Sequence, residues 1–151
     1  MNRRIILLAA LATTLVLPLF GTSGEPTKVI IDADPAIGVP FKDVDDGLML
    51  LVALNSPELE ILGITTTYGN ASEGVAFEKT RELLELARRH DVPVIRGAEA
   101  GTAAGTETPA SLFIAEVAES FPGEVTVLAV GPMTNIATAI MNHPQVVNDL
   151  R

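Results

Sequence analysis

The chain has 151 residues, a formal net charge of −9 at pH 7 and no cysteine. The length indicates about one domain, and the lack of cysteine excludes both a disulfide framework and a thiolate metal site. The acidic balance argues against nucleic acid as a partner, because the phosphates would be repelled, but it is compatible with cation binding.

The first 24 residues have the pattern of a secretory signal peptide. Two arginines precede an apolar run from Ile5 to Phe20, and the small and polar residues of "GTSG" follow it. The run is short for a membrane-spanning helix, which needs ~20 residues, and Pro18 interrupts it. We therefore expect a signal peptide at 1–24, one domain at 25–151 that is periplasmic or secreted, and no stable membrane anchor after cleavage.

Strands and helices alternate along the rest of the chain. A continuous apolar run is typical of a strand covered on both faces, and one lies in "TKVIIDAD" (27–34). Further strands are predicted in the β-rich segment "LEILGITTTYGN" (59–70), in "VPVIRG" (92–97) and in "EVTVLAVGP" (124–132). Helical patterns lie in "DVDDGLMLLVALNSP" (43–57), "SEGVAFEKTRELLELARRH" (72–90), "SLFIAEVAESF" (111–121) and "MTNIATAIMNHP" (133–144). The alternation predicts an α/β fold with an open, mostly parallel, Rossmann-like sheet and helices on both faces.

Two of these segments are apolar enough to be expected in the interior. The helix in 43–57 is apolar nearly all round, and the run in 124–132 predicts a buried strand. Residues 97–110, by contrast, are rich in Gly, Ala and Thr and predict a loop.

Aspartates gather where the first strand ends. Asp32 and Asp34 lie at that end, and Asp45 and Asp46 open the next helix. Ligands of such sheets bind beyond the carboxyl ends of the strands, and the intervening loop can bring the two pairs together. Four converging carboxylates would repel one another unless some were protonated or a cation lay among them. Oxygen ligands favour calcium or magnesium, and the lack of a nearby His or Cys argues against zinc.

Each of these polar residues also has a purely structural interpretation. An Asp at a helix start can be a cap, an Asp at a strand end can fix a turn, and Asp43 can be a surface loop residue. Asn70, after the second strand, could be a turn residue, and Thr134 and Asn135 could cap their helix. If the strand order brings these loops beside the first strand, an amide and a free backbone carbonyl would join the carboxylates.

Four motifs, in this order, resemble the inosine-uridine preferring nucleoside hydrolases: "IIDADP" with "DVDDGLMLLVAL", then "ILGITTTYGN", "VPVIRGA" and "VLAVGPMTNIA". The resemblance runs from about Lys28 to the end of the chain. The gap within the aspartate motif is lengthened here by "VPFKDV", and Ala36 stands where the family often has Gly. The resemblance implies an open α/β fold that binds one calcium ion. It also implies a nucleosidase-type N-glycosyl hydrolase that converts ribonucleosides to a free base and ribose.

The same resemblance implies a role for each matched residue. Asp34 would contact calcium and act as general base on the attacking water, and Asp46 would chelate the calcium. Asp45 and Asn70 would hydrogen-bond the ribose hydroxyls of the nucleoside substrate. Asp32 would support the cluster without contacting the metal.

A further calcium ligand would be the main-chain carbonyl of Val130. Family members are about twice as long, and their second half supplies another aspartate ligand and the groups that recognise or protonate the leaving base. His90 and His143 have the positions of a helix-dipole partner and a surface residue, so neither is assigned as that acid. We therefore expect a truncated fold with an exposed edge strand, weak calcium binding, little activity alone and a possible homo-oligomer.

Two other functions account for some of these residues. A phosphatase of the haloacid dehalogenase type would use Asp32 as nucleophile, Asp34 as acid/base and magnesium, but it does not explain "DD" or "VGPMTN". An exported binding module would keep the ribose and metal site without turnover. Calorimetry with ribose and calcium, beside an assay of base release, separates such a module from a hydrolase.

Overall fold

The computed structural model of the protein describes residues 24–151, so the predicted signal peptide lies outside the described residues apart from Gly24. The elements, in chain order, are β1 (Thr27–Ala33), α1 (Asp45–Leu54), β2 (Leu59–Thr66), α2 (Glu73–Ala87), β3 (Val94–Ile95), α3 (Pro109–Ser120), β4 (Val125–Ala129), α4 (Thr134–Asn142) and α5 (Val146–Asp149). The predicted alternation is confirmed, and only the short α5 was not predicted. None of the helices in residues 24–151 is long and apolar enough to cross a membrane.

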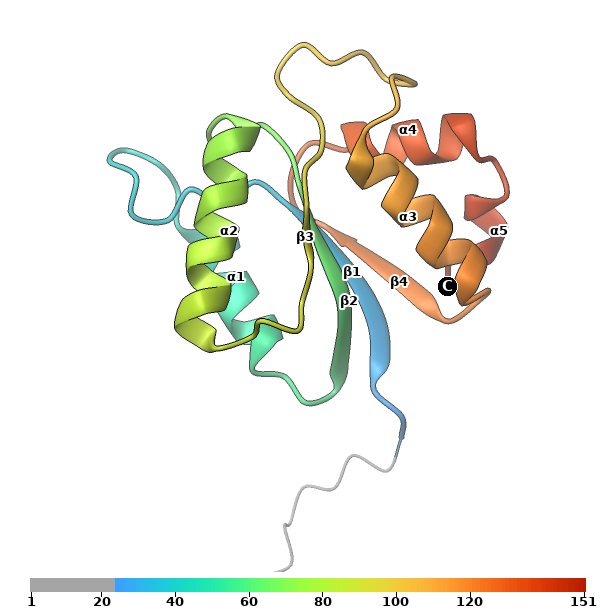
Figure 1. Cartoon of the computed structure of the whole chain (residues 1–151), viewed down its shortest axis with the longest axis horizontal. Coiled ribbons are helices and arrows are strands. Elements are labelled where there is room, and N and C mark those ends of the chain that lie inside the picture. Colours follow the sequence, from blue (N-terminus) through green and yellow to red (C-terminus); the bar gives the residue numbers. More distant parts are fainter. Residues whose placement is uncertain (1–23) are drawn as a thin grey trace, which may run out of the picture.

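The strands form one parallel sheet in the order β3-β2-β1-β4. Strand β1 therefore lies between β2 and β4, with Asp32 opposite Thr65 on one side and Ala129 on the other. Helices α1 and α2 cover one face of the sheet, and α3, α4 and α5 cover the other (Figure 1). The predicted open parallel sheet with helices on both faces is confirmed, and the loops after β1, β2 and β4 meet at one edge.

Strand β1 is buried on both faces, and its side chains alternate between two cores. Val29 and Ile31 pack with the apolar sides of α1 and α2, and Ile30 packs with α3 and α4. Asp32 follows Ile30 by two residues, so its side chain lies on the α3–α4 side of the sheet. Burial of these apolar side chains is the main favourable contribution to folding.

Two predictions of burial were wrong. Helix α1 buries only the side that contacts the sheet and α2, and it exposes Leu48 (52%) and Val52 (69%). Strand β4 exposes Leu128 (39%) because it pairs with β1 on one side only, and Val130, just after it, is 41% exposed. The predicted exposed edge strand is thus observed at β4.

Side-chain caps determine where helices α2 and α3 begin, and a left-handed residue determines where α2 ends. Ser72 accepts a hydrogen bond from the Val75 N–H at the start of α2. Thr108 and Ser111 form a reciprocal capping box at the start of α3. Arg88 adopts a left-handed conformation with φ of 55°, so α2 ends at Ala87 and the predicted helix to His90 is three residues too long.

Candidate functional site

The buried carboxylates of Asp34 and Asp46 lie together at the carboxyl edge of the sheet. Asp34 is 7% exposed and Asp46 is 9% exposed. The Asp34 N–H donates to Asp46 Oδ2 over 2.9 Å. This contact joins the end of β1 to the first turn of α1, so the loop between them folds back as predicted.

Two neighbouring loops close around the Asp34 carboxylate. The Asn70 N–H, after β2, donates to Asp34 Oδ2. A Cβ on Gly69 would overlap the same oxygen, and Gly69 has a φ of 151° that favours glycine. A Cβ on Gly131, after β4, would lie 3.1 Å from Asp34 Oδ1 and 2.7 Å from Thr67 Cγ2. The backbones of both loops therefore form a close cradle around this carboxylate.

Asp32, two residues before Asp34 in the chain, is fully buried. Its Oδ1 accepts hydrogen bonds from Thr65 Oγ1 and Asn135 Nδ2, while its Oδ2 is buried without a partner. Its backbone carbonyl accepts the Val130 N–H over 2.9 Å. Asp32 thus connects β1 to β2, to α4 and to the turn after β4.

Both Asp32 and Asp46 resist ionisation in the folded chain. Burial raises the pKa of Asp32 to about 6, although its hydrogen bonds from Thr65 and Asn135 lower it. Burial is also the main reason that the pKa of Asp46 rises to about 6, and its hydrogen bond with the Asp34 side chain adds to the rise. A cation beside these carboxylates would favour their ionised forms.

The donor set suits a hard cation but is incomplete. All the candidate donors are oxygens, as calcium prefers, and the buried atoms Asp32 Oδ2 and Thr67 Oγ1 have no hydrogen-bond partner. Within residues 24–151, however, no three acidic or histidine side chains lie close enough together to form a metal-binding group. The predicted convergence of four carboxylates is therefore not observed, and Asp34 and Asp46 supply oxygen donors that fit a hard cation but form only part of a donor set.

The two predicted ribose-binding residues lie at the edge of this cluster. Asp45 is exposed, and its Oδ1 accepts a hydrogen bond from the Asp46 N–H over 3.1 Å. Asn70 is half-buried, and its side chain is paired with the backbone of Asp43 in both directions, at 3.2 and 2.9 Å. Asp43 itself is an exposed loop residue. The side chains of Asp45 and Asn70 therefore make hydrogen bonds to backbone groups, and neither side chain is hydrogen-bonded to the carboxylates of Asp34 and Asp46 among the described residues.

One functional candidate was missed in the sequence. Asn135 was considered only as a possible cap, but α4 has no side-chain cap and Asn135 is fully buried. Its amide hydrogen-bonds Asp32 directly. Its position at the start of the helix that follows β4 was the only available signal, because the carboxyl edge is where polar groups meet.

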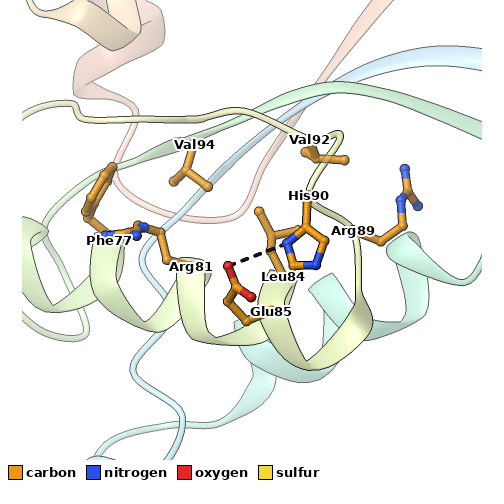
Figure 2. Close-up of a pocket in the computed structure, with 8 residues that line it drawn as sticks. All are labelled: Phe77, Arg81, Leu84, Glu85, Arg89, His90, Val92 and Val94. Atoms are coloured by element: carbon orange, nitrogen blue, oxygen red, sulfur yellow. Dashed lines mark ion pairs between the residues drawn. The ribbon is translucent and has the colours of Figure 1, made fainter.

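A separate hollow lies at the other end of α2 (Figure 2). It has a volume of about 230 Å³ and is lined by Phe77, Arg81, Leu84, Glu85, Arg89, His90, Val92 and Val94. Its charged groups already have partners: Arg89 binds Asp91 and the Leu54 carbonyl, and His90 Nδ1 lies 3.5 Å from Glu85 Oε1. Because α2 begins at the carboxyl edge of the sheet and ends at the opposite edge, this hollow is distant from the aspartates.

Comparisons with known proteins agree with this geometry. Residues 29–151 match the profile of the family described as inosine-uridine preferring nucleoside hydrolase. The chain is 37% identical over 143 residues to uridine nucleosidase 1 of Arabidopsis thaliana, covering 78% of this chain and 40% of that protein. It is 34% identical over 149 residues to probable uridine nucleosidase 2 of the same plant, covering 81% and 44%.

Solved structures give the same result. A plant nucleoside hydrolase, the PpNRh1 enzyme, superposes with a TM-score of 0.69 and 32% identity, covering 83% of this chain and 46% of that one. A purine-preferring ribonucleoside hydrolase from Gardnerella vaginalis has a TM-score of 0.69 and 26% identity, covering 82% and 46%. The chain therefore spans less than half the length of these relatives, and the predicted fold and family resemblance are confirmed.

Proposed function

Because the chain belongs to the inosine-uridine preferring nucleoside hydrolase family, we propose that it supplies half of a site that hydrolyses the N-glycosidic bond of ribonucleosides. The family is metal-dependent, and we propose calcium as the metal. The observation that carries the proposal is the buried pair of Asp34 and Asp46, joined at 2.9 Å within the residues that match the family.

In this proposal Asp34 and Asp46 hold the calcium together with the main-chain carbonyl of Val130. Bound calcium would lower the pKa of an adjacent water, so that a carboxylate can deprotonate it near neutral pH. Asp34 is the residue that takes this proton. Its Oδ2 is held by the Asn70 N–H, so the carboxylate has a fixed orientation when the proton is transferred.

The water oxygen then forms a bond to the anomeric carbon, and the electrons of the glycosidic bond leave with the base nitrogen. Positive charge develops on the ribose ring as this bond breaks. The fixed carboxylate of Asp46, which keeps its negative charge after Asp34 has taken the proton, stabilises that positive charge. We assign no residue of this chain to the protonation of the leaving base.

Asp45 and Asn70 would bind the ribose hydroxyls. Asp45 is exposed next to Asp46, and one of its oxygens is already used by its own helix. Asn70 would first have to release the backbone of Asp43. Ribose binding through Asn70 would therefore require a movement of the loop that carries Asp43.

The test combines calcium calorimetry with an assay of base release from uridine and inosine. We expect weak one-to-one calcium binding that Asp34→Asn removes. We also expect slow base release, well below the ~1 per second of a typical enzyme, that falls ~100-fold or more in Asp34→Asn, as for loss of a general base. Asp43→Asn, an exposed loop variant, is the control and should match the parent chain. Equal base release by the parent and Asp34→Asn would contradict the proposal.

A binding module without turnover is the second candidate, because we assign no residue within 24–151 to the protonation of the leaving base. It would bind ribose and calcium in calorimetry and release no base above the Asp34→Asn background. The phosphatase alternative has less support, because Asp32 is fully buried and hydrogen-bonded and so is not placed as a nucleophile. Trapping of an aspartyl-phosphate at Asp32 would restore it.

Export of the protein remains a proposal drawn from the basic and apolar pattern of residues 1–24. Expression of the whole chain in a bacterium, followed by mass spectrometry of the periplasmic fraction, tests it. The expected product begins near residue 25. Recovery of the uncleaved chain from the membrane would instead support an anchor.

A further inference from the structure

The side chain of Asn135 joins the carboxyl ends of several strands. Its Nδ2 donates to Asp32 Oδ1 in β1 and to the carbonyl of Thr66 at the end of β2, both over 2.9 Å. Its Oδ1 accepts the Ala98 N–H, after β3, at 2.9 Å and Thr108 Oγ1 at 3.3 Å. Asn135 itself follows β4. The amide therefore uses two donors and two acceptor positions, which is its full hydrogen-bonding capacity.

The surroundings leave no room for this amide to move. Asn135 is fully buried, and a Cβ on Gly97 would lie 2.6 Å from its Oδ1. The backbone of Gly97 therefore packs directly against the amide. A different donor pattern at position 135 would leave buried polar groups of three other segments without partners, which costs free energy.

Asn135 is hydrogen-bonded to neither Asp34 nor Asp46, but it is hydrogen-bonded to Asp32. Asp32 in turn is connected to two proposed calcium ligands, the Val130 carbonyl and Asp34. The Asp32 carbonyl accepts the N–H groups of Val130 at 2.9 Å and of Gly131 at 3.4 Å. Asp34 follows Asp32 by two residues in the chain. Among residues 24–151, the Asp32 side chain accepts two hydrogen bonds, from Thr65 and Asn135.

We propose that Asn135 is a positioning residue of the calcium site. Acting through Asp32, it holds the Asp34 carboxylate and the Val130 carbonyl in the relative position that a shared cation requires. The inference rests on the proposed function, since it concerns the same site. Groups that orient metal ligands typically contribute 10- to 100-fold to metal affinity.

A merely structural residue would hold the loop after β3 without affecting the metal site, and Thr138 is a matched example. Thr138 is also buried on α4, and its Oγ1 accepts the Gly105 N–H of that loop over 3.0 Å. Among the described residues, Thr138 makes no hydrogen bond with Asp32. The test therefore compares Asn135→Leu with Thr138→Val in the full chain.

The first measurement is calcium affinity by calorimetry. We expect Asn135→Leu to bind calcium 10- to 100-fold more weakly and Thr138→Val to bind it as the parent does. The second measurement is amide hydrogen exchange by NMR without metal. Exchange at Val130 and Gly131 should be faster in Asn135→Leu and unchanged in Thr138→Val, because these amides depend on the Asp32 carbonyl.

A reciprocal variant covers the case in which Asn135→Leu does not fold. Asn135→Asp places a second carboxylate against Asp32, and adding Asp32→Asn restores one donor and one acceptor between the two positions. The double variant should bind calcium more tightly than Asn135→Asp alone. No recovery, or equal weakening by Thr138→Val, would overturn the inference.

The two measurements separate this inference from the proposed function. If the parent chain binds no calcium but Asn135→Leu speeds exchange at Val130 and Gly131, the metal proposal fails and the support of Asp32 by Asn135 stands. If the parent chain binds calcium and Asn135→Leu binds it equally well, the positioning role fails and the proposed function stands.

Discussion

The carboxylate of Asp34 is held in a space that glycine residues leave open. Gly131→Ala should weaken calcium binding about 10-fold, because the new Cβ would lie 3.1 Å from Asp34 Oδ1 and 2.7 Å from Thr67 Cγ2. Calorimetry measures the effect. Gly74→Ala in α2 is the control, since its Cβ would meet only Arg96 Nη1 at 4.0 Å. That variant should keep its calcium affinity and gain up to ~1 kcal/mol of stability from better helix propensity.

The raised pKa of Asp46 predicts how stability depends on pH without metal. The pKa is near 3.8 in an unfolded chain and about 6 in the folded chain, so the folded state binds more protons between these values. Stability therefore falls as the pH rises from about 4 to about 6. Asp46→Asn removes this titration and should be more stable than the parent at pH 7, with little difference at pH 4. Urea unfolding in EDTA at pH 4 and pH 7 measures the free energy of unfolding of both proteins. The same difference between Asp46→Asn and the parent at the two pH values would contradict the prediction.

Part of the site could be predicted from sequence at this scale. Asp34 directly follows strand β1, and Asp46 lies in the first turn of helix α1. Because the two elements are consecutive in the chain, the short loop between them can bring these two positions together. The exposure of Asp45 could not be read in the same way, because neighbours on a helix point in different directions. Asn135 was missed because its partner Asp32 is 103 residues away in the sequence, and only the strand order brings them into contact.

At the scale of elements, Glu73 joins α2 to the ends of two strands. It is 2% exposed, accepts Thr66 Oγ1 at 2.7 Å and pairs with Arg96 Nη1 at 2.9 Å. The Arg96 guanidinium also lies 4.0 Å from the centre of the Phe77 ring. The first turn of α2 is thereby held against the end of β2 and the segment after β3.

Glu73→Ala should destabilise the protein by ~2 kcal/mol, because it removes the shorter hydrogen bond of the buried Thr66 hydroxyl and the ion pair of Arg96. Glu73→Gln keeps an acceptor for Thr66 and should cost less. The control is Glu82→Ala on the same helix, whose pair with Lys79 is on the surface and should contribute little. Urea unfolding compares the three variants, and a Glu82→Ala loss as large as that of Glu73→Ala would contradict the argument.

The order of the elements was predictable because continuous apolar runs and amphipathic helices alternate. The exposed side of α1 was not, because hydrophobicity shows which residues can be buried and not which ones have a neighbour. Leu48 and Val52 are as apolar as Leu50 and Leu54, yet only the latter two face the sheet. The same reasoning applies to Leu128, whose strand has one partner.

At the scale of the whole molecule, a calcium ion at the proposed site would connect the end of β1 to the start of α1 and to the turn after β4. Since the unfolded chain does not bring Asp34 and Asp46 together, calcium should bind only the folded state and stabilise it. The gain would be ~2.7 kcal/mol when free calcium is 100 times its dissociation constant.

This stabilisation must be distinguished from general screening, because the chain carries a net charge of −9 and any salt reduces its self-repulsion. Thermal unfolding in calcium should show a higher midpoint than in sodium chloride of equal ionic strength. Asp34→Asn should lose that excess, whereas Asp43→Asn, which removes one exposed charge outside the buried pair, should keep it. If the midpoint of Asp34→Asn rises with calcium as much as that of the parent, the ion acts on the acidic surface as a whole and the buried aspartates do not form its site.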